Sequence, residues 1–123
     1  MNARRQRGKT NYHKGIMAEN QVADAYRRSG FDVIDTRYKT PDGEIDVVAR
    51  HGDKLYFVEV KSSRTHASAC QMITPRQQKR IHDAALHYIA DKAKTMDVDC
   101  RFDAALIDAQ GRLKVLPGAI YFD

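Results

Sequence analysis

The sequence has 123 residues, of which 42% are hydrophobic and 30% are charged, and its formal net charge is +5. This size and composition predict one globular domain with its own core. No apolar run reaches the about 18 residues of a membrane span, and the N-terminus lacks the apolar segment of a secretory signal, so we expect a cytoplasmic protein without a membrane partner. The two cysteines, Cys70 and Cys100, match no zinc or redox spacing.

The positive charge is concentrated at the N-terminus. Residues 1–14 hold five basic residues and no acid, which leaves the rest of the chain balanced in charge. We therefore predict a basic, flexible arm over residues 1–14 and a single domain over residues 15–123. Such an arm contacts nucleic-acid phosphates in many proteins, but a solvated tail has the same composition. The basic residues of the arm are Arg4, Arg5, Arg7, Lys9 and Lys14.

A helix and a strand follow the arm. Apolar residues recur at helical spacing from about Tyr12 to Arg28, and Gly30 stands where a glycine commonly ends a helix. Residues 31–37 alternate apolar and polar side chains as a strand does, and residues 39–43 have the composition of a turn.

The remaining elements complete an α/β fold. Residues 43–61 predict a β-hairpin, and Thr74 followed by Pro75 predicts the start of a second helix. Residues 101–109 read as a strand, and residues 113–122 read as a final edge strand that contains a proline. The predicted order is α-β-β-β-α-β-β.

The hairpin brings acids together. A two-residue turn at Gly52-Asp53 pairs residues whose numbers sum to 105, so Asp46 faces Glu59 and Glu44 faces Lys61 on one side of the sheet. Two ionised carboxylates at this spacing are destabilising unless a cation lies between them or one is protonated. The pattern therefore predicts Mg²⁺ on Asp46 and Glu59, with Lys61 holding or deprotonating the attacking water.

A plainer interpretation remains open. The charged face can be exposed to solvent, with Glu44 and Lys61 as a surface ion pair, because the opposite face can form the core alone. Leu55 and Phe57 share the charged face and indicate that a helix partly covers it. The expected core residues of the opposite face are Ile45, Val47, Tyr56, Val58 and Val60.

A family resemblance rests on these residues. Asp46, twelve intervening residues and then Glu59-Val60-Lys61 resemble the PD-(D/E)XK nuclease signature. From Gly15 to Asp108 the chain is similar to the YraN family of uncharacterised bacterial endonucleases, and more distantly to archaeal Holliday junction resolvases. The segments that carry the similarity are Gly15, Glu19, Ala23, Tyr26, Gly30-Phe31, GEIDVVA, FVEVK, ITPRQQKRI and RFDAALID.

The resemblance implies a restriction endonuclease-like core, with a central mixed β-sheet flanked by helices. It implies that Asp46, Glu59 and the Val60 carbonyl hold Mg²⁺ or Mn²⁺ and that Lys61 positions the nucleophile. It also implies that Glu19 is an auxiliary acid, although a solvated helix position explains Glu19 as well.

Two positions near the motif need separate interpretation. The literal Pro-Asp pair, Pro41-Asp42, lies too far along the hairpin to face Glu59, so we assign the motif acid to Asp46. Glu44 and Gln77 are candidate accessory residues, but the place of Gln77 in a capping box with Thr74 gives it a sufficient structural role.

We expect a metal-dependent nuclease acting on branched or single-stranded DNA rather than RNA. Phosphate contacts are assigned to the N-terminal arm and to Arg76, Lys79 and Arg80, which can equally form a solvated helix face. The alternatives are a nucleic-acid-binding module without cleavage activity and a protein-interaction module. The sequence leaves the substrate structure and the oligomeric state open, and a dimer is compatible with it.

Overall fold

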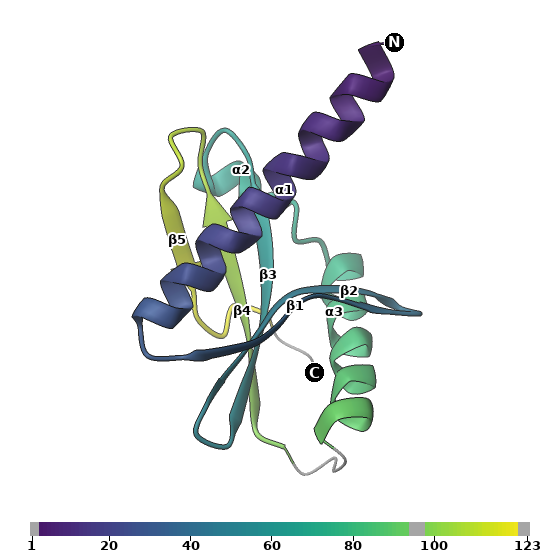
Figure 1. The fold of residues 1–123 in the computed structure, drawn as a ribbon, viewed down its shortest axis with the longest axis vertical. Helices are drawn as coiled ribbons and strands as arrows, with labels where there is room; N and C mark the ends of the chain where they lie inside the picture. Colours follow the sequence, from purple (N-terminus) through teal and green to yellow (C-terminus); the bar gives the residue numbers. More distant parts are fainter. Residues whose placement is uncertain (1–2, 94–97, 121–123) are drawn as a thin grey trace.

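Five strands form one mixed sheet with helices packed on it (Figure 1). The computed structural model describes the backbone of residues 3–93 and 98–120 and the side chains of residues 13–93 and 98–120. The strand order is β1-β2-β3-β4-β5; β3 and β4 run parallel and the other neighbours run antiparallel. The elements are α1 (Ala3–Arg28), β1 (Asp32–Thr40), β2 (Gly43–His51), β3 (Lys54–Ser62), α2 (His66–Gln71), α3 (Pro75–Tyr88), a π-helical turn η1 (Ile89–Ala93), β4 (Cys100–Ile107) and β5 (Leu113–Leu116).

This architecture confirms the predicted α/β fold with a mixed sheet flanked by helices, with two differences in the helices. The helix α2 was not predicted; its N-cap Thr65 and Ser68 form a reciprocal capping box. The start predicted for α1 at about Tyr12 is too late, because the helix begins at Ala3. Its first residues are mostly Ala, Arg, Gln and Lys, which are strong helix formers.

The side chains of Arg4, Arg5, Arg7 and Lys9, assigned to the basic arm, lie outside the described residues. No helix in the part of the chain that the structure describes combines the length and apolar character needed to cross a membrane.

The β2–β3 hairpin has the predicted register. All pairs from Val47–Val58 to His51–Lys54 have numbers that sum to 105. Gly52 has a φ of 61°, the left-handed conformation that the predicted turn requires at its first central position. The hairpin turn therefore fixes which side chains of β2 and β3 share a face.

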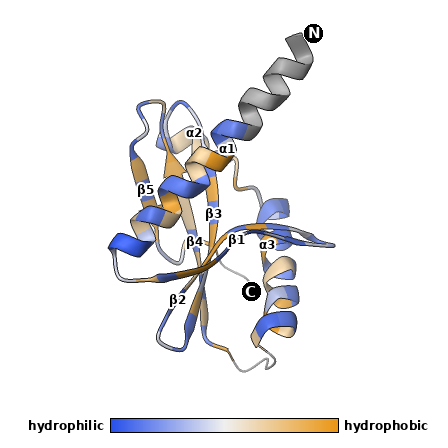
Figure 2. Cartoon of the chain, in the orientation of Figure 1, coloured by the Kyte–Doolittle hydropathy of each residue, from blue (hydrophilic) through white to orange (hydrophobic). Residues whose placement is uncertain are grey.

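Helices α1 and α3 cover opposite faces of the sheet, and each buries a core cluster. On one face α1 packs against a cluster that includes Val47 and Val58, and on the other α3 packs against Val48 and Phe57. Apolar residues are accordingly concentrated in the strands between the helices (Figure 2). The helix predicted to cover Phe57 is α3.

One predicted core position is wrong. Ile45 was expected beside Val47, but it packs in the α3 cluster with Val48. The tip of the β1–β2 hairpin crosses over α3 (Figure 1), where Arg80 Nε donates a hydrogen bond of 3.3 Å to the Asp42 carbonyl. Since the hairpin turns toward the helix, a side chain near its tip contacts α3 rather than α1.

A buried carboxylate joins α1 to strand β4. Asp103 in β4 is fully buried and accepts a hydrogen bond of 2.7 Å from the Tyr26 hydroxyl. Arg101 donates to both carboxylate oxygens, and the Gly118 amide donates to one of them. Both oxygens of the buried Asp103 carboxylate therefore have hydrogen-bond donors. Because one of these donors is on α1, the network orients α1 against β4.

We predict that Tyr26→Phe lowers the free energy of unfolding by about 1.5–3 kcal/mol, because it removes a buried hydrogen bond to a charged acceptor. Tyr38→Phe is the matched control, since the Tyr38 hydroxyl donates to Asp91 at the surface, and we expect it to cost less than about 1 kcal/mol. Urea unfolding followed by circular dichroism measures both. Equal losses would mean that Asp103 is adequately solvated without Tyr26.

Candidate active site

The predicted acids of the β2–β3 hairpin and Lys61 line one polar pocket of about 260 Å³. It lies between the ends of β2 and β3 and the N-terminal half of α3. Its lining contains the four charged residues that the hairpin register placed on one face, together with three residues of α3. The lining residues are Gly43, Glu44, Asp46, Glu59, Lys61, Gln77, Arg80 and Ile81.

Asp46 is held by a backbone amide of the neighbouring strand. Its Oδ2 atom accepts a hydrogen bond of 2.8 Å from the Val60 amide. The described backbone pairs between β2 and β3 begin at the turn and end at Val47–Val58, the pair next to Asp46 and Glu59. The carboxylate therefore takes the place of a ladder acceptor, and it lies against Glu59 as the register predicted.

Glu59 is a buried acid with a cationic partner. It is only 5% exposed, and its Oε1 atom lies 3.1 Å from Lys61 Nζ. Burial and the neighbouring Asp46 charge raise the pKa of Glu59 to about 8, against the opposite effect of Lys61. Burial likewise raises the pKa of Asp46. A fully solvated charged face is therefore ruled out, and the partner of Lys61 is Glu59 rather than Glu44.

Helix α1 brings a third acid, Glu19, close to Asp46. Ligand oxygens of Glu19, Glu44 and Asp46 all lie within 4.8 Å of one another. Burial, followed by the charges of Asp46 and Glu44, raises the pKa of Glu19 to about 7. Its buried Oε2 atom has no hydrogen-bond partner among the described residues. This oxygen without a hydrogen-bond partner and the all-carboxylate donor set fit a hard divalent cation such as Mg²⁺ or Mn²⁺.

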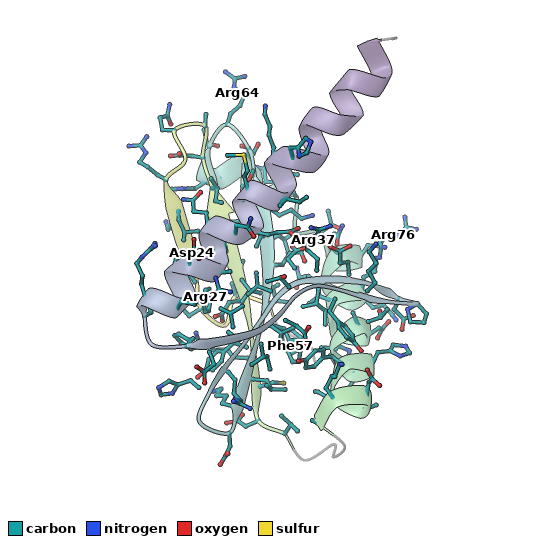
Figure 3. All side chains as sticks on the ribbon, viewed as in Figure 1. Asp24, Arg27, Arg37, Phe57, Arg64 and Arg76 are labelled. Carbon is teal, nitrogen blue, oxygen red and sulfur yellow. The ribbon has the colours of Figure 1, made fainter. Side chains whose placement is uncertain are left out.

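The cluster also contains a cation that sequence reasoning missed. Arg37 Nε lies 3.5 Å from Glu19 Oε2 and 3.9 Å from Glu44 Oε1. Arg37 has a φ of 51°, the one left-handed non-glycine conformation among the described residues. It lies between α1 and the N-terminal end of α3 (Figure 3). The signal that could have identified Arg37 is the register of the β1–β2 hairpin, which places it opposite Asp46.

The other predicted contacts fall into two groups. Arg80 and Gln77 line the pocket, whereas Arg76 is exposed on the first turn of α3 (Figure 3) and Lys79 pairs with Asp83 at 2.8 Å. The predicted N-cap of α3 is confirmed, since Thr74 Oγ1 accepts the Gln77 amide. The capping box predicted between Thr74 and Gln77 is only half formed: the Gln77 backbone amide satisfies the cap, while its side chain lines the pocket.

Comparison with known proteins identifies the family. Residues 18–107 match the profile of the Uncharacterised protein family UPF0102. The chain belongs to the UPF0102 family. A UPF0102 protein of Ruegeria pomeroyi is 41% identical over 119 residues, covering 97% of each chain. One from Cereibacter sphaeroides is 41% identical over 112 residues, covering 91% of this chain and 96% of its own, and one from Bradyrhizobium diazoefficiens is 42% identical over 96 residues, covering 78% and 72%.

We predict that Glu59 makes this UPF0102 protein less stable as pH rises. The folded state keeps the Glu59 proton up to a pKa of about 8, whereas the unfolded chain loses it near 4.5. The free energy of unfolding therefore falls between about pH 4.5 and 8, and this group contributes no further change above that range. In metal-free buffer at pH 9, Glu59→Gln should be more stable than the wild type by at least about 1 kcal/mol, since one pKa unit corresponds to about 1.4 kcal/mol.

Urea unfolding in EDTA from pH 5 to pH 9 measures this effect. Asp53→Asn, in the exposed turn of the same hairpin, is the control and should follow the wild-type curve. Parallel pH curves for the wild type and Glu59→Gln would show that Glu59 is ionised at neutral pH and would contradict the prediction.

Proposed function

We propose that this UPF0102 protein is a nuclease of the PD-(D/E)XK class that cleaves DNA with Mg²⁺ or Mn²⁺, on a restriction endonuclease-like fold. The observation that carries the proposal is the convergence of Asp46, Glu59 and Lys61 in one pocket, with Glu19 beside them from α1. The spacing of the first three residues is that of the nuclease signature. Branched or single-stranded DNA is the proposed substrate, and the cytoplasm its proposed location.

The residues of the pocket are suited to a divalent cation. We assign Asp46, Glu59 and the Val60 carbonyl as its ligands, with Glu19 as an additional acid. Three of these groups are carboxyl groups with raised pKa values, so a cation can stabilise charges that the pocket solvates poorly. When bound, such an ion polarises a phosphoryl oxygen and lowers the pKa of a coordinated water.

The protein side chains supply positioning and charge. The Lys61 ammonium group, held 3.1 Å from Glu59, is placed to orient a nucleophilic water or to stabilise a developing negative charge. Arg80 and Gln77, on the opposite wall of the pocket, are suited to hold the phosphate that is attacked. Arg37 forms ion pairs with Glu19 and Glu44 and so holds these two acids beside the pocket.

The buried acids favour an enzyme over a module that only binds nucleic acid. Glu59 is buried next to a second carboxylate, an arrangement that destabilises the metal-free fold and repels phosphate. A surface used only for binding gains nothing from it. The basic sequence at the start of α1 is compatible with both functions, so only a cleavage assay separates them.

We predict that calorimetry detects Mg²⁺ or Mn²⁺ binding to the wild type and that Asp46→Ala and Glu59→Ala lose it. Cleavage of labelled DNA should be lost in both variants. Lys61→Ala removes no ligand, so it should keep metal binding while its cleavage rate falls by about 10²-fold or more. The wild type should also unfold at higher temperature with metal than with EDTA.

Asp53→Ala and Lys54→Ala in the β2–β3 turn are matched controls, since they remove the same types of charge from exposed or half-exposed positions of the same hairpin. Single-stranded, duplex and four-way-junction DNA, together with an RNA strand, should be compared as substrates. Metal binding that survives in both acid variants would refute the site. Equal residual cleavage in all variants would identify a contaminating nuclease.

A further inference from the structure

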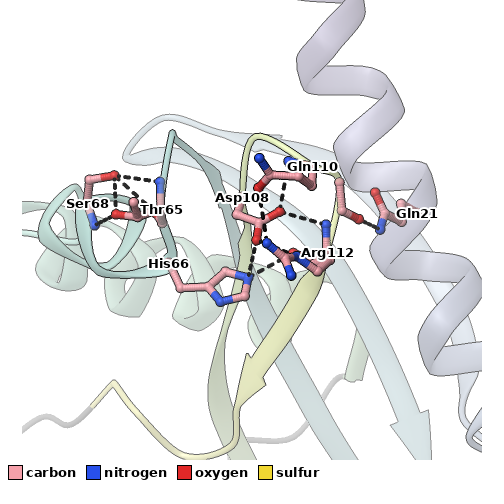
Figure 4. Close-up of polar contacts among 8 residues, drawn as sticks. Gln21, Thr65, His66, Ser68, Asp108, Gln110 and Arg112 are labelled. Carbon is pink, nitrogen blue, oxygen red and sulfur yellow. Dashed lines mark hydrogen bonds and ion pairs between the residues drawn. The ribbon is translucent and has the colours of Figure 1, made fainter.

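A large groove lies on the side of α1 away from Glu19. It has a volume of about 1010 Å³, and its walls are α1, the end of β3 with the residues that follow it, and the turn between β4 and β5. The walls are joined by a hydrogen bond of 2.8 Å from Gln21 Nε2 to the Gly111 carbonyl (Figure 4). The groove is therefore formed by elements far apart in the sequence, and a hydrogen bond holds α1 to the β4–β5 turn.

The available charge in the groove is positive. Three exposed cations line it: Lys14, Arg28 and Arg64. None of them forms an ion pair with another side chain in residues 13–93 or 98–120.

The two acids of the groove are already paired. Asp24 pairs with Arg27 at 2.9 Å, and Asp108 pairs with Arg112 at 3.0 Å (Figures 3 and 4). An anionic ligand therefore meets three unpaired cations without displacing an existing ion pair.

The groove and the candidate active site share their dividing wall. Ser62 lines the groove and directly follows Lys61, which lines the pocket, because successive strand residues point to opposite faces. On α1, Ala18 lines the groove and Glu19 joins the acidic cluster. Only the end of β3 and the width of α1 separate the two sites.

The basic residues of the groove are followed by more basic sequence along α1. From Lys14 the helix runs back to Ala3 and projects beyond the body of the protein (Figure 1). The sequence of this extension contains four more basic residues and no acid. A long anion lying in the groove is therefore met by further basic sequence where it leaves the groove at Lys14.

We propose that this groove binds the sugar–phosphate backbone of a single DNA strand and delivers it to the pocket at Lys61; this rests on the proposed nuclease function and names its substrate form. The volume is at the upper end of the about 300–1,000 Å³ typical of pockets for small ligands, which suits a few nucleotides of one strand but not a duplex. The described lining contains no aromatic side chain on which bases could stack. Recognition by charge, amide and hydroxyl groups makes binding tolerant of sequence.

The test measures strand affinity at several salt concentrations by fluorescence anisotropy, in EDTA so that cleavage cannot interfere. The groove variant is Lys14→Ala/Arg28→Ala/Arg64→Ala. The control, Arg50→Ala/Lys54→Ala/Lys92→Ala, removes the same net charge from η1 and from the ends of β2 and β3 beside their turn, which lie at the other end of the molecule (Figure 1). Circular dichroism melting checks that both variants are folded.

We expect the groove variant to bind a labelled single strand at least tenfold more weakly at low salt. Its slope of log affinity against log salt should be shallower by about 2, since each phosphate contact on a single strand contributes about 0.7. The control variant should keep the wild-type slope. With Mg²⁺, the groove variant should raise KM for strand cleavage and leave kcat unchanged, because it alters no residue of the pocket.

The outcomes separate this inference from the proposed function. If the groove and control variants bind alike, or if the groove variant loses duplex binding to the same extent, the groove is not a site for a single strand. If wild type binds no strand even at low salt, the inference is overturned and the groove has another occupant, such as a second copy of the chain. Strand binding that depends on the groove, without metal-dependent cleavage, would support the groove and refute the nuclease.

Discussion

The hydrogen bond between the Val60 amide and Asp46 organises the centre of the molecule. A carboxylate, rather than a backbone carbonyl, accepts the hydrogen bond from this amide. The backbone pairing of β2 with β3 therefore ends here, where the tip of the β1–β2 hairpin turns toward α3. The turn brings Ile45 onto α3 and leaves space beside Glu59 that the α3 side chains border.

The pocket holds more negative charge than its surroundings solvate. Burial raises the pKa of Asp46, Glu59 and Glu19, and the two cations in contact with them, Lys61 and Arg37, only partly oppose this effect. Elsewhere the same chain satisfies a buried carboxylate completely, as it does for Asp103. Among the described residues, the buried carboxylates that lack full compensation lie at this pocket, which is typical of a site that is stabilised by its ligand.

The parts of the structure that depend on local rules could be predicted from the sequence. A two-residue turn at Gly52 sets the hairpin register, and Thr74 caps α3 through its own side chain, so both were predictable without tertiary information. The face occupied by Ile45 depends on how the β1–β2 hairpin crosses α3, which no local rule gives. The register of that hairpin places Arg37 opposite Asp46, but no propensity indicates the left-handed backbone of Arg37. Glu19 was identified only through the family resemblance, because nothing local fixes how α1 lies on the sheet.

The left-handed backbone of Arg37 also affects the edge of the sheet. Strand β1 is an outer strand, and besides Arg37 it contains a shift in register between Val33 and Asp35. The other outer strand, β5, has four residues and is followed by Pro117. Irregular, short and proline-flanked edges are poor templates for an added strand. The sheet thus resists edge-to-edge aggregation at both sides, and the same residue that holds the acids of the pocket contributes to that protection.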